Sequence, residues 1–126
     1  MAGKPKGRYS LEDVRRLAPT LDVGPNVTAR MCRENCLITF KKAIPYVREI
    51  IQNDLVPEAF VDTKRQNYKD ANNNHIYADV YGIKNKKGVW YVKFYIECDK
   101  LIVVSCHEPE FPIKRVDGRT IRPREQ

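Results

Sequence analysis

The second half of the chain holds three segments in which apolar and polar residues alternate, and this pattern constrains the fold more than any other feature. The segments are 75–83, 89–97 and 101–107, and each is rich in β-branched and aromatic residues. A period of two places alternate side chains on opposite faces of a strand. Short polar connectors separate the segments. The pattern therefore predicts two successive hairpins that form a three-stranded antiparallel meander.

The first half of the chain shows helical spacing instead. Ser10 is a favourable N-cap with acidic residues in the turn that follows, which predicts a helix over 11–18. A second helix is expected over 28–36. Pro45 is expected to interrupt the next segment, and helical spacing resumes over 46–55. Three helices are therefore expected before the strands.

Together these elements predict one α+β domain, in which N-terminal helices pack on an antiparallel sheet of three to four strands. Residues 60–64 are expected to supply the fourth strand, and 67–74 a polar surface loop. The domain is expected to span 9–110. A flexible basic N-terminus, 1–8, would precede it, and a basic extended tail, 111–126, would follow it.

Charge and composition narrow the class of function. The chain has 126 residues and a net charge of +7, which suits a nucleic acid or an acidic protein partner. A solvated basic surface without such a partner explains the same charge. No apolar run reaches the ~18 residues that cross a bilayer, and the basic N-terminus leads into no apolar segment typical of a secretory signal. We therefore expect a cytoplasmic protein that does not bind membranes.

The cysteines do not show the spacing of a metal site. Cys32 and Cys36 have three residues between them, whereas Cys98 and Cys106 lie much further apart than a zinc knuckle requires. The two histidines are not at knuckle spacing either. We expect no metal and no cofactor, and we interpret the thiols as small hydrophobic groups.

Alternation assigns the two faces of the meander. The apolar face, expected to lie against the helices, carries Ile76, Ala78, Val80, Trp90, Val92, Phe94, Ile96, Ile102, Val104 and Cys106. The opposite face carries Tyr77, Asp79, Tyr81, Tyr91, Lys93, Tyr95, Leu101, Val103, Ser105 and His107. Short turns predict two rows across this second face, Tyr81–Tyr91–His107 and Asp79–Lys93–Ser105. We expect the rows to form the floor of a site.

The residue types on this face suit cleavage of RNA without a metal. Attack by the 2′-hydroxyl needs a base, the leaving 5′-oxygen needs a proton, and the phosphorane needs cations. His107 would act as base or acid, Tyr91 would share proton transfer or orient the phosphate, and Lys93 and Lys64 would supply charge. Further residues expected to bind RNA are Tyr77 and Tyr81, as platforms for bases, and Arg65, Lys84, Lys86 and Lys87, as cations.

A purely structural interpretation covers the same residues. Tyrosine is common on the exposed face of a sheet, and Asp79 opposite Lys93 would be an ordinary ion pair of roughly 0.2–1 kcal/mol. A lone histidine at a strand end is commonly solvated, and lysines at a hairpin tip favour solubility. Taken one residue at a time, the structural interpretation is the stronger. Taken together, the grouping of these residues on one face of a basic chain favours the functional interpretation.

The order of five short motifs resembles a known family. The motifs are Tyr-x-Leu-x-x-Val at 9–14, Phe-Val-Asp-Thr-Lys at 60–64, Tyr-Ala-Asp-Val-Tyr at 77–81, Gly-Val-Trp-Tyr-Val-Lys-Phe at 88–94 and Leu-Ile-Val-Val-Ser-Cys-His-Glu at 101–108. In this order they resemble the motility quorum-sensing regulator (MqsR) toxins of bacterial toxin–antitoxin systems. The resemblance implies a RelE-like α+β fold and metal-independent mRNA interferase activity.

The resemblance also implies roles at single positions. The family's tyrosine and lysine of the Tyr-x-Lys strand match Tyr91 and Lys93. The lysine that often follows the family's Phe-Tyr falls at Asp62, and Lys64 is the nearest lysine. The family's glutamine falls at Ala78, and its closing lysine falls at His107. Histidine is a better general base near neutral pH than an unperturbed lysine.

The sequence therefore predicts an mRNA interferase toxin that cleaves single-stranded RNA by acid–base transesterification. The resemblance implies an antitoxin partner, either acidic or DNA-binding. Whether the RNA is cut free or on the ribosome stays open. Two alternatives are a non-catalytic RNA- or DNA-binding module and a protein-interaction domain that binds an acidic partner.

Overall fold

The predicted succession of helices and then strands is present in the computed structural model, which describes residues 6–35 and 37–123. The helices are α1 (Leu11–Leu17), α2 (Pro25–Glu34) and α3 (Phe40–Glu49), with short helical turns at Ala18–Thr20, Ile50–Asp54 and Pro57–Ala59. The strands are β1 (Asp22–Val23), β2 (Phe60–Lys69), β3 (His75–Asn85), β4 (Gly88–Glu97), β5 (Lys100–His107), β6 (Ile113–Lys114) and β7 (Thr120–Ile121).

The helices follow their local signals, with two corrections to the prediction. Ser10 caps α1 as expected, because its Oγ accepts the Asp13 N–H at 3.1 Å. The second helix begins at Pro25, earlier than predicted, because proline is well suited to the first turn of a helix. The third runs through Pro45, which was expected to interrupt it. Pro45 and Lys41 are both exposed, so the Lys41 carbonyl that loses its helical partner can bond to water.

The sheet confirms the meander and extends it to five strands. The order is β1-β5-β4-β3-β2, antiparallel except for the parallel pair β1–β5. Strand β2 is longer than predicted and ends at Lys69, so the expected polar loop begins inside it. Asp70 closes the actual turn, since its Oδ1 accepts the amides of Asn72 and Asn74. The α+β architecture is therefore the one expected, with a mixed sheet in place of a purely antiparallel one.

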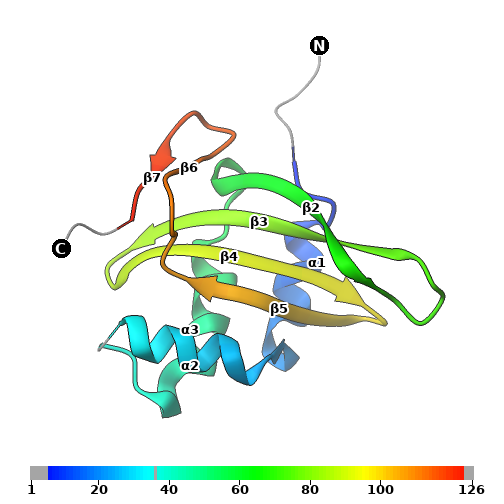
Figure 1. Ribbon diagram of the computed structural model, residues 1–126, viewed down its shortest axis with the longest axis horizontal. Helices are drawn as coiled ribbons and strands as arrows, with labels where there is room; N and C mark the ends of the chain where they lie inside the picture. Colours follow the sequence, from blue (N-terminus) through cyan, green and yellow to red (C-terminus); the bar gives the residue numbers. More distant parts are fainter. Residues whose placement is uncertain (1–5, 36, 124–126) are drawn as a thin grey trace.

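One face of the sheet is covered by the helices. Figure 1 shows α2 and α3 beneath the sheet and the β6–β7 hairpin on its opposite side. The side chains buried between helices and sheet include Val14, Leu17, Met31, Val47, Ile51, Tyr81, Trp90, Val92, Phe94, Leu101, Val103 and Cys106. We call the other face, which carries Lys64, Tyr91, Lys93, Ser105 and His107, the open face.

Asn85 fixes the register of β3 on β4. Its Oδ1 accepts the Lys87 amide at 3.0 Å and the Gly88 amide at 3.2 Å. Asn85 therefore pairs with Gly88 across a two-residue turn, and Ile83 pairs with Trp90. The sequence reading treated 84–88 as connector and placed the register one residue out.

This shift reverses the predicted faces of β3. Tyr77, Asp79 and Tyr81 leave the open face, whereas Ile76, Ala78 and Val80 take their places on it. The rows expected across the sheet are therefore wrong in their β3 members. Both faces of the central strand β3 are buried, so alternation alone could not assign which face lies against the helices.

A β-bulge sets the register of β5. Cys98 and Asp99 form a tight turn with positive φ angles of 51° and 58°, so that Glu97 pairs with Lys100. The prediction paired Glu97 with Leu101. Further along, the pairs Phe94–Val103 and Lys93–Ser105 leave Val104 as an extra residue. The bulge restores the predicted pairing, and Tyr91 opposes His107 as expected. The inward and outward residues of β5 before the bulge are exchanged, so Leu101 and Val103 are core residues.

The segment predicted to be an extended tail, from residue 111 onward, folds back onto the sheet over the residues that the structure describes. Strands β6 and β7 pair as a hairpin, and the Val116 amide donates to the Phe60 carbonyl at 2.8 Å. Gly82 allows the hairpin to pack closely on β3, because a Cβ there would lie 3.0 Å from Ile113 Cδ1 and 3.2 Å from Ile121 Cγ1. The hairpin is thus part of the domain.

Asp79 is a buried anchor for the start of the domain. Its carboxylate is 0% exposed and accepts the backbone amides of Arg8 and Tyr9, each at 2.9 Å, and the Thr63 hydroxyl at 2.7 Å. Residues 1–5 of the predicted flexible N-terminus lie outside the described residues. Arg8, which the prediction included in that segment, is tied to the sheet.

Candidate functional site

The four residues predicted to be catalytic lie around one cavity on the open face. The cavity has a volume of about 340 Å³, and it is lined by Lys64, Tyr91, Lys93, Ser105, His107, Pro109, Glu110, Phe111 and Ile113. Strands β2, β4 and β5 supply the first five of these residues, and the segment after β5 supplies the rest. Because the helices cover the other face, the cavity opens to solvent between the sheet and this C-terminal segment.

His107 has one ring nitrogen engaged and one directed away from that contact. Its Nδ1 lies 2.8 Å from the Glu108 carbonyl oxygen. A carbonyl can only accept, so Nδ1 carries the proton and Nε2 of the neutral ring is left with its lone pair. The ring also stacks on Tyr91, with centroids 5.2 Å apart and planes inclined by 17°. These contacts fix the tautomer and the orientation of a potential proton acceptor.

Lys93 and Lys64 bring two positive charges to the same cavity. Lys93 is half-buried on β4 opposite Ser105 of β5, whereas Lys64 is exposed on β2 opposite Ala78 of β3. Burial lowers the pKa of the Lys93 ammonium, and the neighbouring charge of Lys64 lowers it further. A lysine with a lowered pKa donates a proton more readily than an ordinary lysine.

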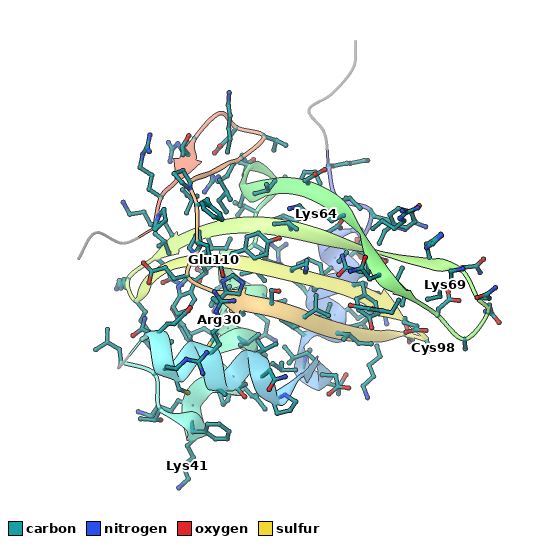
Figure 2. The ribbon with its side chains drawn as sticks, viewed as in Figure 1. Arg30, Lys41, Lys64, Lys69, Cys98 and Glu110 are labelled. Atoms are coloured by element: carbon teal, nitrogen blue, oxygen red, sulfur yellow. The ribbon has the colours of Figure 1, made fainter. Side chains whose placement is uncertain are left out.

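The segment after β5 forms a wall of the cavity and is fixed at both ends. Figure 2 shows Glu110 beside Arg30, and Arg30 Nη2 donates to Glu110 Oε1 at 2.7 Å. Pro109 is buried, and Ile113 packs over Gly82 at the far end. Phe111 lies between these anchors with 72% of its surface exposed.

Several of the expected residues do not join this cavity. Tyr81 is 2% exposed and stacks on Phe94 with ring centroids 5.6 Å apart, so the prediction of an exposed base platform is wrong. Asp79 is buried and does not pair with Lys93. Arg65 opposes Tyr77 on the face away from Lys64. The alternation that brings Lys64 to the cavity therefore takes Arg65 away from it.

Tyr77 is occupied by the N-terminal segment. The guanidinium carbon of Arg8 lies 4.9 Å from the Tyr77 ring centroid, and the Tyr9 hydroxyl donates to the Tyr77 carbonyl at 2.7 Å. This cation–π contact covers the ring on which a base was expected to stack. The one-residue register shift in β3 accounts for both misplaced tyrosines.

The lysines of the β3–β4 hairpin tip line a separate cavity. Lys84, Lys86 and Lys87 surround a volume of about 320 Å³ together with Leu37. Lys84 and Lys86 are exposed, whereas the Lys87 ammonium lies 4.3 Å from the Tyr46 ring centroid. Gly88 starts β4 three residues before Tyr91, a distance of about 10 Å along a strand. The tip is thus at the same end of the sheet as the candidate site.

Sequence reasoning missed Arg30, Glu110 and Phe111. Arg30 belongs to α2 and comes close to the site only through tertiary packing, which no local pattern announces. Phe111 carried a usable signal, because it stands between Pro109 and Pro112 directly after His107. Prolines on both sides of an aromatic residue restrict the backbone and present the ring.

Other kinds of site and comparisons with known proteins add little. Within 6–35 and 37–123, no three His, Cys, Asp or Glu side chains are grouped closely enough to hold a metal ion. Over the same residues, no helix has the length and apolar character to span a membrane. No model of a known protein family matches the chain. No curated protein matches it either.

Proposed function

We propose that the protein is a metal-independent endoribonuclease that cleaves single-stranded RNA, acting as an mRNA interferase toxin of a toxin–antitoxin system. The observation that carries the proposal is the convergence of His107, Tyr91, Lys93 and Lys64 on one open cavity. Transesterification of RNA requires a base, an acid and positive charge near the phosphorane, and His107, Lys93 and Lys64 are side chains that can supply them.

The proposed reaction is an in-line transesterification. His107 Nε2 takes the proton of the ribose 2′-hydroxyl, and the 2′-oxygen forms a bond to phosphorus. The bond from phosphorus to the 5′-oxygen then breaks, and the Lys93 ammonium gives its proton to that oxygen. Lys64 stabilises the charge of the phosphorane, and the Tyr91 hydroxyl orients a phosphate oxygen. The products are a 2′,3′-cyclic phosphate and a 5′-hydroxyl.

The basic hairpin tip gives the RNA a path out of the cavity. Lys84 and Lys86 are exposed; Lys84 lies opposite Val89, about 7 Å along the sheet from Tyr91, and Lys86 lies in the turn beyond Gly88, more than about 10 Å from Tyr91. We propose that they hold a flanking phosphate by charge alone. Binding through them falls steeply as salt concentration rises.

The test is RNA cleavage by the purified protein in EDTA, with His107→Ala compared with His75→Ala. His75 also lies at a strand end but is exposed outside the cavity. We expect 2′,3′-cyclic phosphate products from the wild type and His75→Ala. We expect roughly 10²- to 10⁴-fold slower cleavage by His107→Ala, the range for loss of an acid–base group. Salt-dependent binding with no cyclic phosphate would leave the non-catalytic module as the better description.

The proposed toxin has a surface suited to a protein partner. Leu37, Phe40 and Ile44 are 62%, 68% and 41% exposed on α3 and the loop before it. Lys41 lies among them, and Lys84 and Lys86 line the cavity that Leu37 closes. An apolar strip flanked by lysines favours an acidic antitoxin segment with an apolar face.

This partner surface has its own test. Co-expression of an adjacent reading frame should relieve growth arrest caused by the wild type. It should fail to relieve arrest caused by Ile44→Glu, because Ile44 lines neither the candidate site nor the cavity of the hairpin tip. Relief of both would place the partner elsewhere on the molecule.

A further inference from the structure

We infer that Phe111 is the platform of a nucleobase-binding subsite, formed by the segment that follows β5. The inference rests on the proposed function, since it places a base next to the phosphate at which His107 and Lys93 transfer protons. It goes beyond the proposed function because it assigns a ligand contact to a segment outside the strands that carry the catalytic groups.

The exposure of Phe111 is the first observation. Among the large hydrophobic side chains that the structure describes, it is the most exposed, at 72%. Leaving a phenyl ring in water forfeits burial worth about 1.5–3 kcal/mol. The ring nevertheless lines the cavity that holds His107, Tyr91 and Lys93.

The rigidity of the segment is the second observation. Glu108 and Phe111 each precede a proline, which favours an extended backbone at both positions. The Arg30–Glu110 ion pair at 2.7 Å holds the segment on the α2 side. Ile113 and Ile121 hold it over Gly82 on the other side. The ring is therefore presented by a fixed backbone, which reduces the entropy lost on binding.

The chemistry of the surroundings identifies the ligand. A base is a flat π system attached to an anionic backbone, and here a flat apolar ring lies at the rim of a cavity with two lysines. Stacking on phenylalanine tolerates every base, so we expect affinity from this subsite without strong base preference.

The experiment measures binding of a cleavage-resistant 2′-O-methyl oligouridylate that carries 5-iodouracil. The variants are Phe111→Ala, Phe111→Leu and Phe111→Trp, with Phe40→Ala as the control because Phe40 is 68% exposed outside the cavity. We expect Phe111→Ala to bind roughly 5- to 100-fold more weakly, the range for one lost stack. Phe111→Trp should keep the affinity, and Phe40→Ala should match the wild type. Photocrosslinking should attach the iodouracil to Phe111.

Several outcomes would overturn the inference. They are wild-type affinity in Phe111→Ala or Phe111→Leu, or a crosslink that maps outside 109–113. The two proposals fail separately. Affinity that depends on Phe111 without cleavage by the wild type would remove the nuclease and keep the subsite. Cleavage and binding that do not depend on Phe111 would remove the subsite and keep the nuclease. Absence of RNA binding at low salt would remove both the nuclease and the subsite.

Discussion

The imidazole of His107 stacks on the phenol of Tyr91 because the two residues are direct partners across β4 and β5, and their ring centroids lie 5.2 Å apart. This contact and the hydrogen bond to the Glu108 carbonyl orient the same ring from two directions. Tyr91 therefore has two separable parts, a ring that positions His107 and a hydroxyl that we propose orients a phosphate oxygen.

Tyr91→Phe and Tyr91→Ala separate these two parts. We expect Tyr91→Phe to keep the ring-current shifts of the His107 protons and to lose about tenfold in kcat/KM, as expected for one lost hydrogen bond to the phosphate. Tyr91→Ala should lose both the ring-current shifts and a larger share of activity. NMR of the histidine protons and cleavage kinetics measure the two effects. Equal kinetics for both variants would assign the whole contribution of Tyr91 to its hydroxyl.

Lys64→Met is expected to raise the pKa of Lys93. The Lys64 charge lowers that pKa in addition to burial, and the substitution removes only the charge. The alkaline limb of the pH–rate profile should then move to higher pH while the rate falls. Lys69→Met is the matched control, since Lys69 is the last residue of β2 and lies away from Lys64, as Figure 2 shows. An NMR titration of the Lys93 side chain measures the shift, and an unchanged pKa in Lys64→Met would contradict the assigned cause.

Lys93 also predicts a pH dependence of stability. Its folded-state pKa lies below that of the unfolded chain, so between the two values the unfolded state binds more protons. The free energy of unfolding therefore rises with pH in that window, because the cost of burying the charge disappears. We expect Lys93→Met to be more stable than the wild type at neutral pH, with a difference that shrinks as pH rises through the window. Urea unfolding at a series of pH values measures it, and a constant difference would refute the account.

The strand content follows from the sequence because β4 alternates cleanly between apolar and polar residues. The His107–Tyr91 pair was predicted from the wrong turn register, and it is present because the extra residue Val104 compensates for that error. The face of β3 does not follow, because its register depends on how the Asn85 side chain closes the turn. The choice of Tyr91 and Lys93 followed from the residue types on the polar face of β4. Arg30 and Glu110 meet only in the folded protein, across most of the chain.

Asp79→Asn is expected to loosen the N-terminal segment. The carboxylate accepts three hydrogen bonds in a buried position, and an amide would direct its NH₂ at donors. We expect a loss of roughly 1.5–3 kcal/mol in the free energy of unfolding, typical of hydrogen bonds to a charged group. Hydrogen exchange at the Arg8 and Tyr9 amides should accelerate. The exposed Asp62→Asn serves as control, and unchanged protection of those amides in Asp79→Asn would contradict the anchoring role.

Tyr81 tests the correction to the predicted base platform. Tyr81→Phe should bind RNA as the wild type does, since the ring is buried between Phe60 and Phe94. Tyr81→Ala should lose about 3–5 kcal/mol of stability by leaving a cavity in the core. Urea denaturation and RNA-binding titrations measure the two effects. Weaker binding by a stably folded Tyr81→Phe would reopen a role for the hydroxyl.

The extra residue Val104 determines which face of the sheet carries His107. An even or odd count of residues between the Cys98–Asp99 turn and the end of β5 decides which side of the sheet receives the imidazole. Because the count from Leu101 to His107 is even, a β5 strand that paired without the bulge would keep every side chain of the candidate site in the polypeptide and yet point His107 at the core and Cys106 at the solvent. Deletion of Val104 would make the count odd, so that a regular strand would again place His107 opposite Tyr91 on the open face.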